Sequence, residues 1–114
     1  MPMRGLTIIV AGGDPARFGT ALTLAAAQAA LGGRATVFVD GGAVVLLAPT
    51  PEADDAPGRR DLIETALDIG VRIVACQSGL ALAGLSLAAL DPRIEGGGLV
   101  SIMAALGDDR LTIA

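Results

Sequence analysis

The chain has 114 residues, of which 53% are hydrophobic, 2% aromatic and 18% charged, with a formal net charge of −4. This length holds one hydrophobic core, so we expect a single domain over residues 1–114. All eight basic residues are arginine, and histidine, lysine, tyrosine and tryptophan are absent. The composition therefore excludes histidine general bases, lysine Schiff bases and histidine-ligated metals, and it argues against nucleic acid as a partner. We expect no metal and no cofactor.

The first half of the chain begins with an apolar run, Leu6–Ala11, that predicts a buried central strand. Asp14 is a candidate cap and Pro15 fits the first position of a helix that extends to Leu31. A second strand is predicted over Ala35–Val39. The short apolar segment after it, Ala43–Ala48, suits either a helical turn or a strand.

The helix predicted over residues 15–31 is apolar around most of its circumference. Two lines of apolar side chains follow it: Phe18, Leu22, Ala25 and Ala29 in the first, and Leu24, Ala27 and Leu31 in the second. Such a helix is usually covered on more than one side. In so small a domain we expect another subunit to cover the second line, which predicts a homo-oligomer.

The second half starts with a proline-containing segment, Pro49–Gly58, which is either a lid or a simple connection. The elements predicted after it are an amphipathic helix over Arg59–Ile69, a strand over Val71–Ala75, short helices over Leu80–Ala89 and Leu99–Leu106, and a closing strand over Arg110–Ile113. Gly96–Gly98 suits a flexible connection or an anion-binding nest. Alternating strands and helices predict a three-layer α/β sandwich with a mostly parallel sheet of four or five strands.

Two observations bear on the compartment. Residues 1–11 lack the form of a signal peptide, and a single cysteine, Cys76, suits a reducing environment, so we expect a cytoplasmic protein. Residues 73–90 are uncharged over 18 positions, the lower limit for a membrane span. Because polar residues and glycines interrupt them, we expect a strand, a turn and a short helix there, and no membrane partner.

The candidate site lies where the carboxyl ends of parallel strands meet, since ligands bind at that edge of an open sheet. Three segments converge there: Gly12, Gly13 and Asp14; Asp40 and Gly41; and Cys76, Gln77, Ser78 and Gly79. Unpaired N–H groups at the start of a helix favour a thiolate, which makes Cys76 a candidate nucleophile. A lone cysteine can equally be a small buried hydrophobe, and the residues alone leave both readings open.

Three stretches together resemble the small DsrE/DsrF-like proteins, the sulfur-relay family that includes TusD-type subunits. They are Gly5–Val10 with Gly13–Pro15, then Val37–Gly41, and then Val71–Gly79 with its Ala-Cys-Gln junction. The similarity extends to Gly96–Ser101 and Asp109–Ile113.

The resemblance implies a flavodoxin-like α/β subunit that assembles into homotrimers or hexamers. It also implies that Cys76 carries sulfane sulfur as a persulfide and exchanges it with donor and acceptor proteins, as a sulfurtransferase would. The alternative is a non-catalytic oligomeric module that binds a small anion at the strand ends, with Cys76 a structural residue.

Overall fold

The computed structural model describes residues 3–48 and 58–114. Its strands are β1 (Leu6–Val10), β2 (Ala35–Val39), β3 (Arg72–Cys76), β4 (Glu95–Gly97) and β5 (Arg110–Ile113). Its α-helices are α1 (Pro15–Ala30), α2 (Gly58–Asp68), α3 (Gln77–Ala83) and α4 (Leu99–Ala104), and two 3-10 helices are η1 (Gly41–Leu47) and η2 (Leu87–Ala89). The segment predicted as a possible lid lies outside the described residues, except for Gly58, which begins α2.

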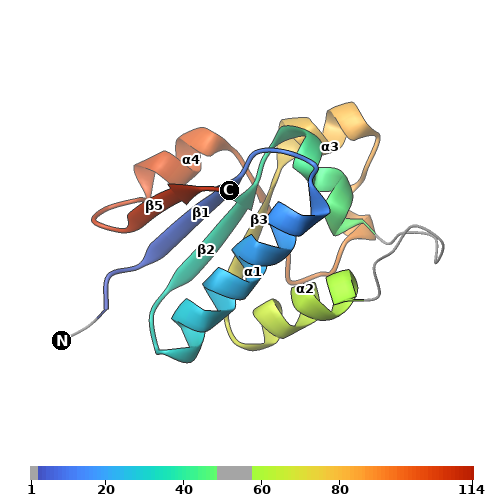
Figure 1. The fold of residues 1–114 in the computed structure, drawn as a ribbon. Coiled ribbons are helices and arrows are strands. Elements are labelled where there is room, and N and C mark those ends of the chain that lie inside the picture. Colours follow the sequence, from blue (N-terminus) through green and yellow to red (C-terminus); the bar gives the residue numbers. More distant parts are fainter. Residues whose placement is uncertain (1–2, 49–57) are drawn as a thin grey trace.

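The five strands form one parallel sheet in the order β4-β3-β2-β1-β5. Helices α1 and α2 cover one face of the sheet, and α4 lies on the other (Figure 1). The predicted α/β fold class is therefore confirmed. The chain advances from β1 to β4 in one direction and then returns past β1 to add β5, so the direction of strand addition reverses between β1 and β5.

The core sits under α1 and α2. Every residue of β1 is buried, and the buried aromatic side chains Phe18 and Phe38 pack within the same cluster. On α2 the buried residues are Ile63, Ala66 and Leu67, as its amphipathic pattern predicts. No helix within the described ranges has both the length and the apolarity needed to cross a membrane.

The region after β3 differs from the sequence prediction. Helix α3 starts at Gln77, directly after the strand, and ends at Gly84, which has a left-handed conformation with φ 69°. The helix predicted over Leu80–Ala89 is therefore confirmed as far as Ala83 and wrong beyond it, because Gly84 terminates it. Only the short η2 turn, Leu87–Ala89, follows.

The glycine run that suggested a connection or a nest forms the edge strand β4. A Cβ added to Gly96 would lie 3.0 Å from Leu87 Cδ2, and one added to Gly97 would lie 2.9 Å from Val74 Cγ1. These glycines let neighbouring side chains pack across the strand. Sequence reasoning missed β4 because glycine has a low β-propensity.

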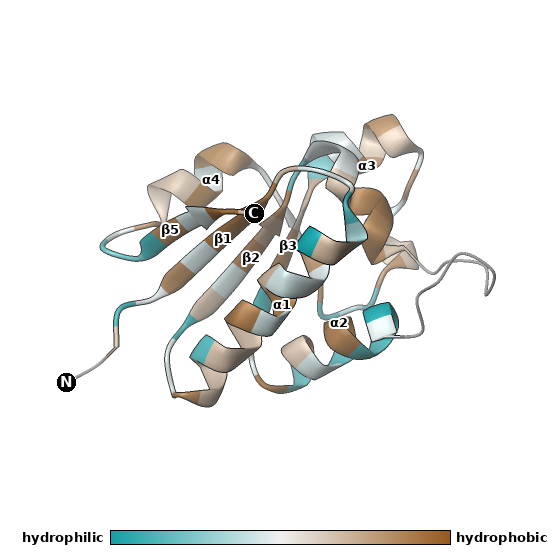
Figure 2. Cartoon of the chain, in the orientation of Figure 1, coloured by the Kyte–Doolittle hydropathy of each residue, from teal (hydrophilic) through white to brown (hydrophobic). Residues whose placement is uncertain are grey.

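The second apolar line of α1, which was predicted to be covered by another subunit, is exposed in the single chain. Phe18, Leu22 and Ala25 are buried, whereas Leu24 is exposed and Leu31 is 73% exposed. Helix α4 and β5 also contain hydrophobic residues (Figure 2). Among them Leu99, Val100, Met103, Leu111 and Ile113 are exposed. The described part of the chain therefore leaves apolar surface uncovered along α1, α4 and β5.

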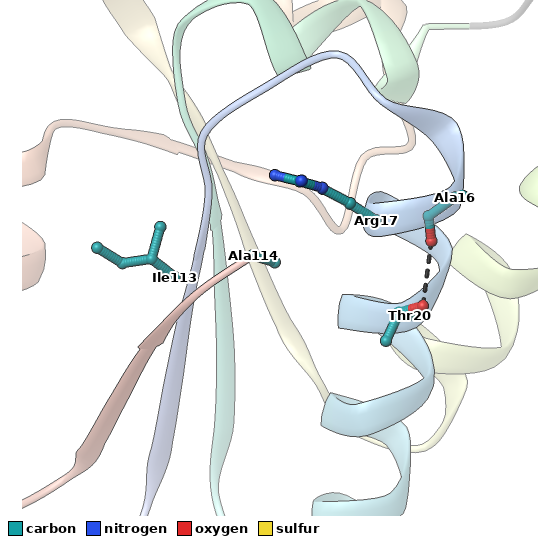
Figure 3. A pocket seen from close by; sticks show the side chains of 5 residues that line it. All are labelled: Ala16, Arg17, Thr20, Ile113 and Ala114. Carbon is teal, nitrogen blue, oxygen red and sulfur yellow. Dashed lines mark hydrogen bonds between the residues drawn. The ribbon is translucent and has the colours of Figure 1, made fainter.

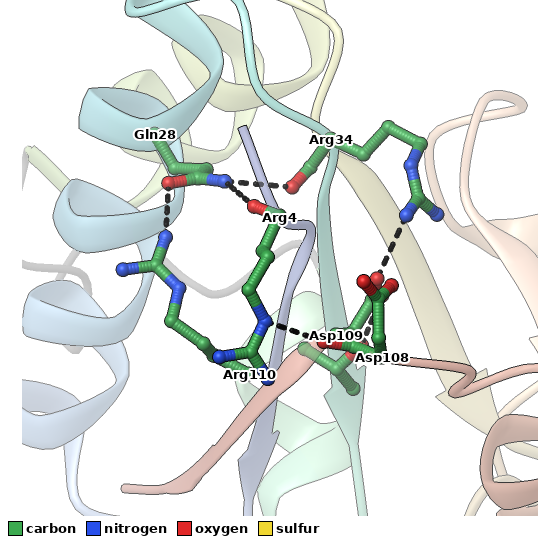
Figure 4. A network of polar contacts seen from close by, with 7 residues as sticks. Arg4, Gln28, Arg34, Asp108, Asp109 and Arg110 are labelled. Atoms are coloured by element: carbon green, nitrogen blue, oxygen red, sulfur yellow. Dashed lines mark hydrogen bonds and ion pairs between the residues drawn. The ribbon is translucent and has the colours of Figure 1, made fainter. Parts of the chain in front are cut away.

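A polar network joins the amino-terminal ends of β1, β2 and β5 (Figure 4). The Gln28 side chain, on a residue only 6% exposed, donates through Nε2 to the main-chain oxygens of Arg4 at 2.7 Å and Arg34 at 3.3 Å. Its Oε1 accepts from Arg110 Nη2 at 2.7 Å. Beside it, the Asp109 carboxylate accepts from Arg34 Nη2 at 2.8 Å. The network ties α1 to three strands.

Candidate functional site

Cys76 is both the last residue of β3 and the N-terminal cap of α3. The Gly79 N–H donates to its Sγ at 3.4 Å, and the Ser78 Oγ lies 3.3 Å from the same sulfur. When the sulfur is a thiolate, only the Ser78 hydroxyl can be the donor of that second bond. Cys76 is buried, with 7% of the residue exposed.

The surroundings lower the pKa of the Cys76 thiol below its ordinary value. The hydrogen bond from Ser78 has the largest effect; burial opposes it, and the N–H groups of Gly79 and Gly41 lower the pKa further. A hydrogen bond with the Asp40 side chain acts in the opposite direction and raises the pKa. The balance favours the thiolate, the form in which cysteine is a nucleophile.

The groups around the Cys76 sulfur are brought together by close packing of the start of α3 against the turn after β2. A Cβ added to Gly79 would lie 2.9 Å from Gly41 O and 3.3 Å from Gly41 N, so glycine is what lets α3 meet the turn after β2. Gly41 itself has a positive φ of 47°, which favours glycine. The predicted site residues Asp40, Gly41, Cys76, Ser78 and Gly79 are therefore brought together around one sulfur.

The remaining predicted residues lie nearby in other roles. A Cβ on Gly13 would be 3.6 Å from Gly42 O, which places the turn after β1 beside the turn after β2, and Gly12 faces open space. Asp14 caps α1 by accepting from Ala16 N at 3.0 Å, as predicted. The Gln77 side chain packs across β4, since its Nε2 would lie 3.1 Å from a Cβ on Gly96.

Two side chains of the site, those of Ser78 and Asp40, have roles that the sequence did not predict. Ser78 was predicted as a site residue without a role for its hydroxyl, and the hydrogen bond of that hydroxyl has the largest effect on the thiol pKa. Asp40 was predicted only to lie in the site, and a hydrogen bond between its side chain and the thiol raises the thiol pKa. Asp40 directly follows β2 and Cys76 ends β3. Because Val39 pairs with Ala75 in these parallel strands, the two residues lie next to each other at the same edge of the sheet.

A separate hollow of about 380 Å³ lies at the carboxyl ends of β1 and β5, where the direction of strand addition reverses. It is lined by Ala16, Arg17 and Thr20 of α1 and by Ile113 and Ala114 (Figure 3). Figure 3 shows that the Arg17 side chain extends from α1 toward the sheet, while Thr20 Oγ1 is bonded to the Ala16 carbonyl.

No family model matches the chain, and no curated protein matches its sequence. Several solved structures share its fold. The ychN protein from E. coli has a TM-score of 0.78 at 21% identity, and MTH1491 from Methanobacterium thermoautotrophicum, a protein of unknown function, has a TM-score of 0.80 at 15% identity. Each alignment covers 98% of this chain and 100% of the other. At these identities the similarity extends to the fold alone.

Proposed function

We propose that the protein is a sulfur-relay protein that holds sulfane sulfur as a persulfide on Cys76. The observation that carries the proposal is the convergence of the Ser78 hydroxyl and the N–H groups of Gly79 and Gly41 on Sγ. A structural cysteine in apolar surroundings has a raised thiol pKa, whereas this one is lowered. The chemistry needs only a thiolate, which suits a chain with no histidine or lysine.

The reaction is two sulfur transfers without net oxidation. The Cys76 thiolate attacks the outer sulfur of a donor persulfide, an S–S bond forms on Cys76, and the donor leaves as a thiolate. An acceptor thiolate then attacks the outer sulfur on Cys76, takes it as a new persulfide, and releases the Cys76 thiolate. The hydrogen-bond donors that lower the pKa of Cys76 stabilise its thiolate before it reacts. They stabilise it again when the Cys76 thiolate is released in the second transfer.

The pH dependence of Cys76 alkylation tests the activated thiol. Because the pKa is lowered, we expect the rate to reach half its maximum below the pH seen for the same protein unfolded in denaturant. Ser78→Ala removes the hydrogen bond that lowers the thiol pKa most. The pKa of Cys76 is therefore expected to rise, and the alkylation rate at pH 7 to fall several-fold. Ser101→Ala, an exposed serine in α4, is the matched control and leaves the rate unchanged.

A native thiol that alkylates slowly at every pH, with Ser78→Ala indistinguishable from the control, would refute the activated thiolate. That outcome favours the alternative of a non-catalytic binding module in which Cys76 is structural. The same alternative predicts that Cys76→Ala lowers stability, as expected for a buried side chain that is truncated.

We also propose that the protein acts in the cytoplasm as a homo-oligomer, a trimer or hexamer as the family resemblance implies. The oligomer is supported by exposed apolar side chains, since Val100 on α4 is 84% exposed and Leu82 on α3 is 90% exposed. Light scattering at micromolar concentration is expected to give a multiple of the monomer mass, and Val100→Glu with Leu82→Glu to lower it. Thr65→Glu on the exposed face of α2 is the control. A monomer mass for the unmodified protein contradicts the proposal.

A further inference from the structure

A groove of about 370 Å³ runs between α1 and β5, distant in sequence from the residues around Cys76. It exists because α1 packs over β1 and β2 and leaves β5 without a helix on this face (Figure 1). Its apolar walls are formed by Leu24 and Ala27 of α1, by Leu31 at the end of that helix, and by Leu111 of β5. The volume lies within the range of small-molecule sites.

One charged side chain, Arg110, also lines the groove. Its Nη2 donates to Gln28 Oε1 at 2.7 Å, and Gln28 is itself buried and fixed by the two main-chain oxygens that it binds. Figure 4 shows the Arg110 guanidinium beneath the Gln28 amide, oriented by it. The guanidinium is therefore held in place before any ligand arrives.

The charge of Arg110 is not neutralised within the described residues. Its hydrogen-bond partner is a neutral amide oxygen, and no carboxylate of the described ranges forms an ion pair with it. The adjacent Asp109 is bonded to Arg34 and Thr7 instead. A guanidinium has five N–H donors, so Arg110 keeps several for a ligand.

We propose that this groove binds a medium-chain aliphatic carboxylate, with its head group on Arg110 and its tail along Leu24, Ala27, Leu31 and Leu111. The planar guanidinium fork matches a carboxylate better than a neutral head group. The apolar walls match an alkyl chain, whose burial is favourable in proportion to its length. The proposal assigns the exposed apolar line of α1 to this ligand in place of the second subunit expected from the sequence. The oligomer proposed above is then formed through the surfaces of α3 and α4 that carry Leu82 and Val100. The proposal does not rest on the function of Cys76.

Calorimetric titration with decanoate tests the site. We expect saturable binding of one decanoate per chain. 1-Decanol has the same tail and acetate has the same head group, and we expect each to bind with an affinity at least about tenfold lower. Arg110→Gln is expected to weaken decanoate binding about tenfold because it removes the charge-assisted bonds. Leu31→Gln, at a position 73% exposed and so tolerant of substitution, also weakens it several-fold.

Arg17→Gln is the matched control, since Arg17 lines the hollow at the other end of the α1 and β5 boundary. It is expected to leave decanoate binding unchanged. The proposal fails if decanoate does not saturate at millimolar concentration, if decanol binds as tightly, or if Arg17→Gln weakens binding while Arg110→Gln does not. Failure here leaves the alkylation and sulfur-loading of Cys76 unaffected, so the two proposals are tested separately.

Discussion

Gly79→Ala is expected to lower the free energy of unfolding by about 2 kcal/mol and to slow Cys76 alkylation at pH 7 several-fold. The added Cβ would lie 2.9 Å from Gly41 O and 3.3 Å from Gly41 N, and both atoms belong to the backbone, which cannot yield as a flexible side chain does. To relieve the contact, α3 must move away from the turn after β2. That movement withdraws the Gly41 N–H from Sγ and raises the pKa of the thiol.

Gly42→Ala is the matched control for this prediction. Gly42 lies in the same turn, its φ is outside the left-handed region, and a Cβ there would meet nothing within 4 Å. Chemical denaturation and the alkylation rate are measured for both variants. Equal behaviour of the two would mean that the contact between α3 and the turn does not support the thiol.

Gln28→Ala is expected to lower the free energy of unfolding by about 3 kcal/mol, which corresponds to a decrease of about 15 °C in Tm for a domain of this size. The truncation leaves the main-chain oxygens of Arg4 and Arg34 without this donor and Arg110 Nη2 without this acceptor. Because Gln28 is 6% exposed, water does not easily replace the lost bonds.

Thr23→Ala is the control on the same helix, where the exposed hydroxyl donates to the Gly19 carbonyl. It is expected to change stability by less than about 0.5 kcal/mol. Thermal unfolding followed by circular dichroism compares the two variants. A Gln28→Ala protein as stable as Thr23→Ala would show that the buried network contributes little to the stability of the fold.

The elements with regular hydrophobic patterns could be predicted from the sequence. The largely apolar residues of β1 and the cap-and-proline start of α1 are local signals, and the structure confirms both. The convergence of Asp40, Gly41 and Cys76 was also predictable, because parallel strands bring their carboxyl ends to one edge. The short strand β4 was not predictable, since its glycines are explained by the side chains of Leu87, Gln77 and Val74 that pack over them.

Details that depend on side-chain direction or on distant partners could not be predicted. The Ser78 hydroxyl reaches Sγ only because the chain turns into α3 immediately after Cys76. Gln28 appears in the sequence as one polar residue on an apolar helix, and its burial is explained by Arg110, 82 positions away. Patterns of period two or 3.6 report which face is buried, and they carry no information on such pairings.

The central claim is that Cys76 accepts and passes on sulfane sulfur, and intact-mass measurement tests it most directly. After incubation with a low-molecular-weight persulfide, the native protein is expected to gain the mass of one sulfur atom at Cys76 and to lose it to an added acceptor thiol. Cys76→Ser is expected to gain none. A native protein whose mass does not change, although its Cys76 takes up sulfur once unfolded in denaturant, would contradict the account.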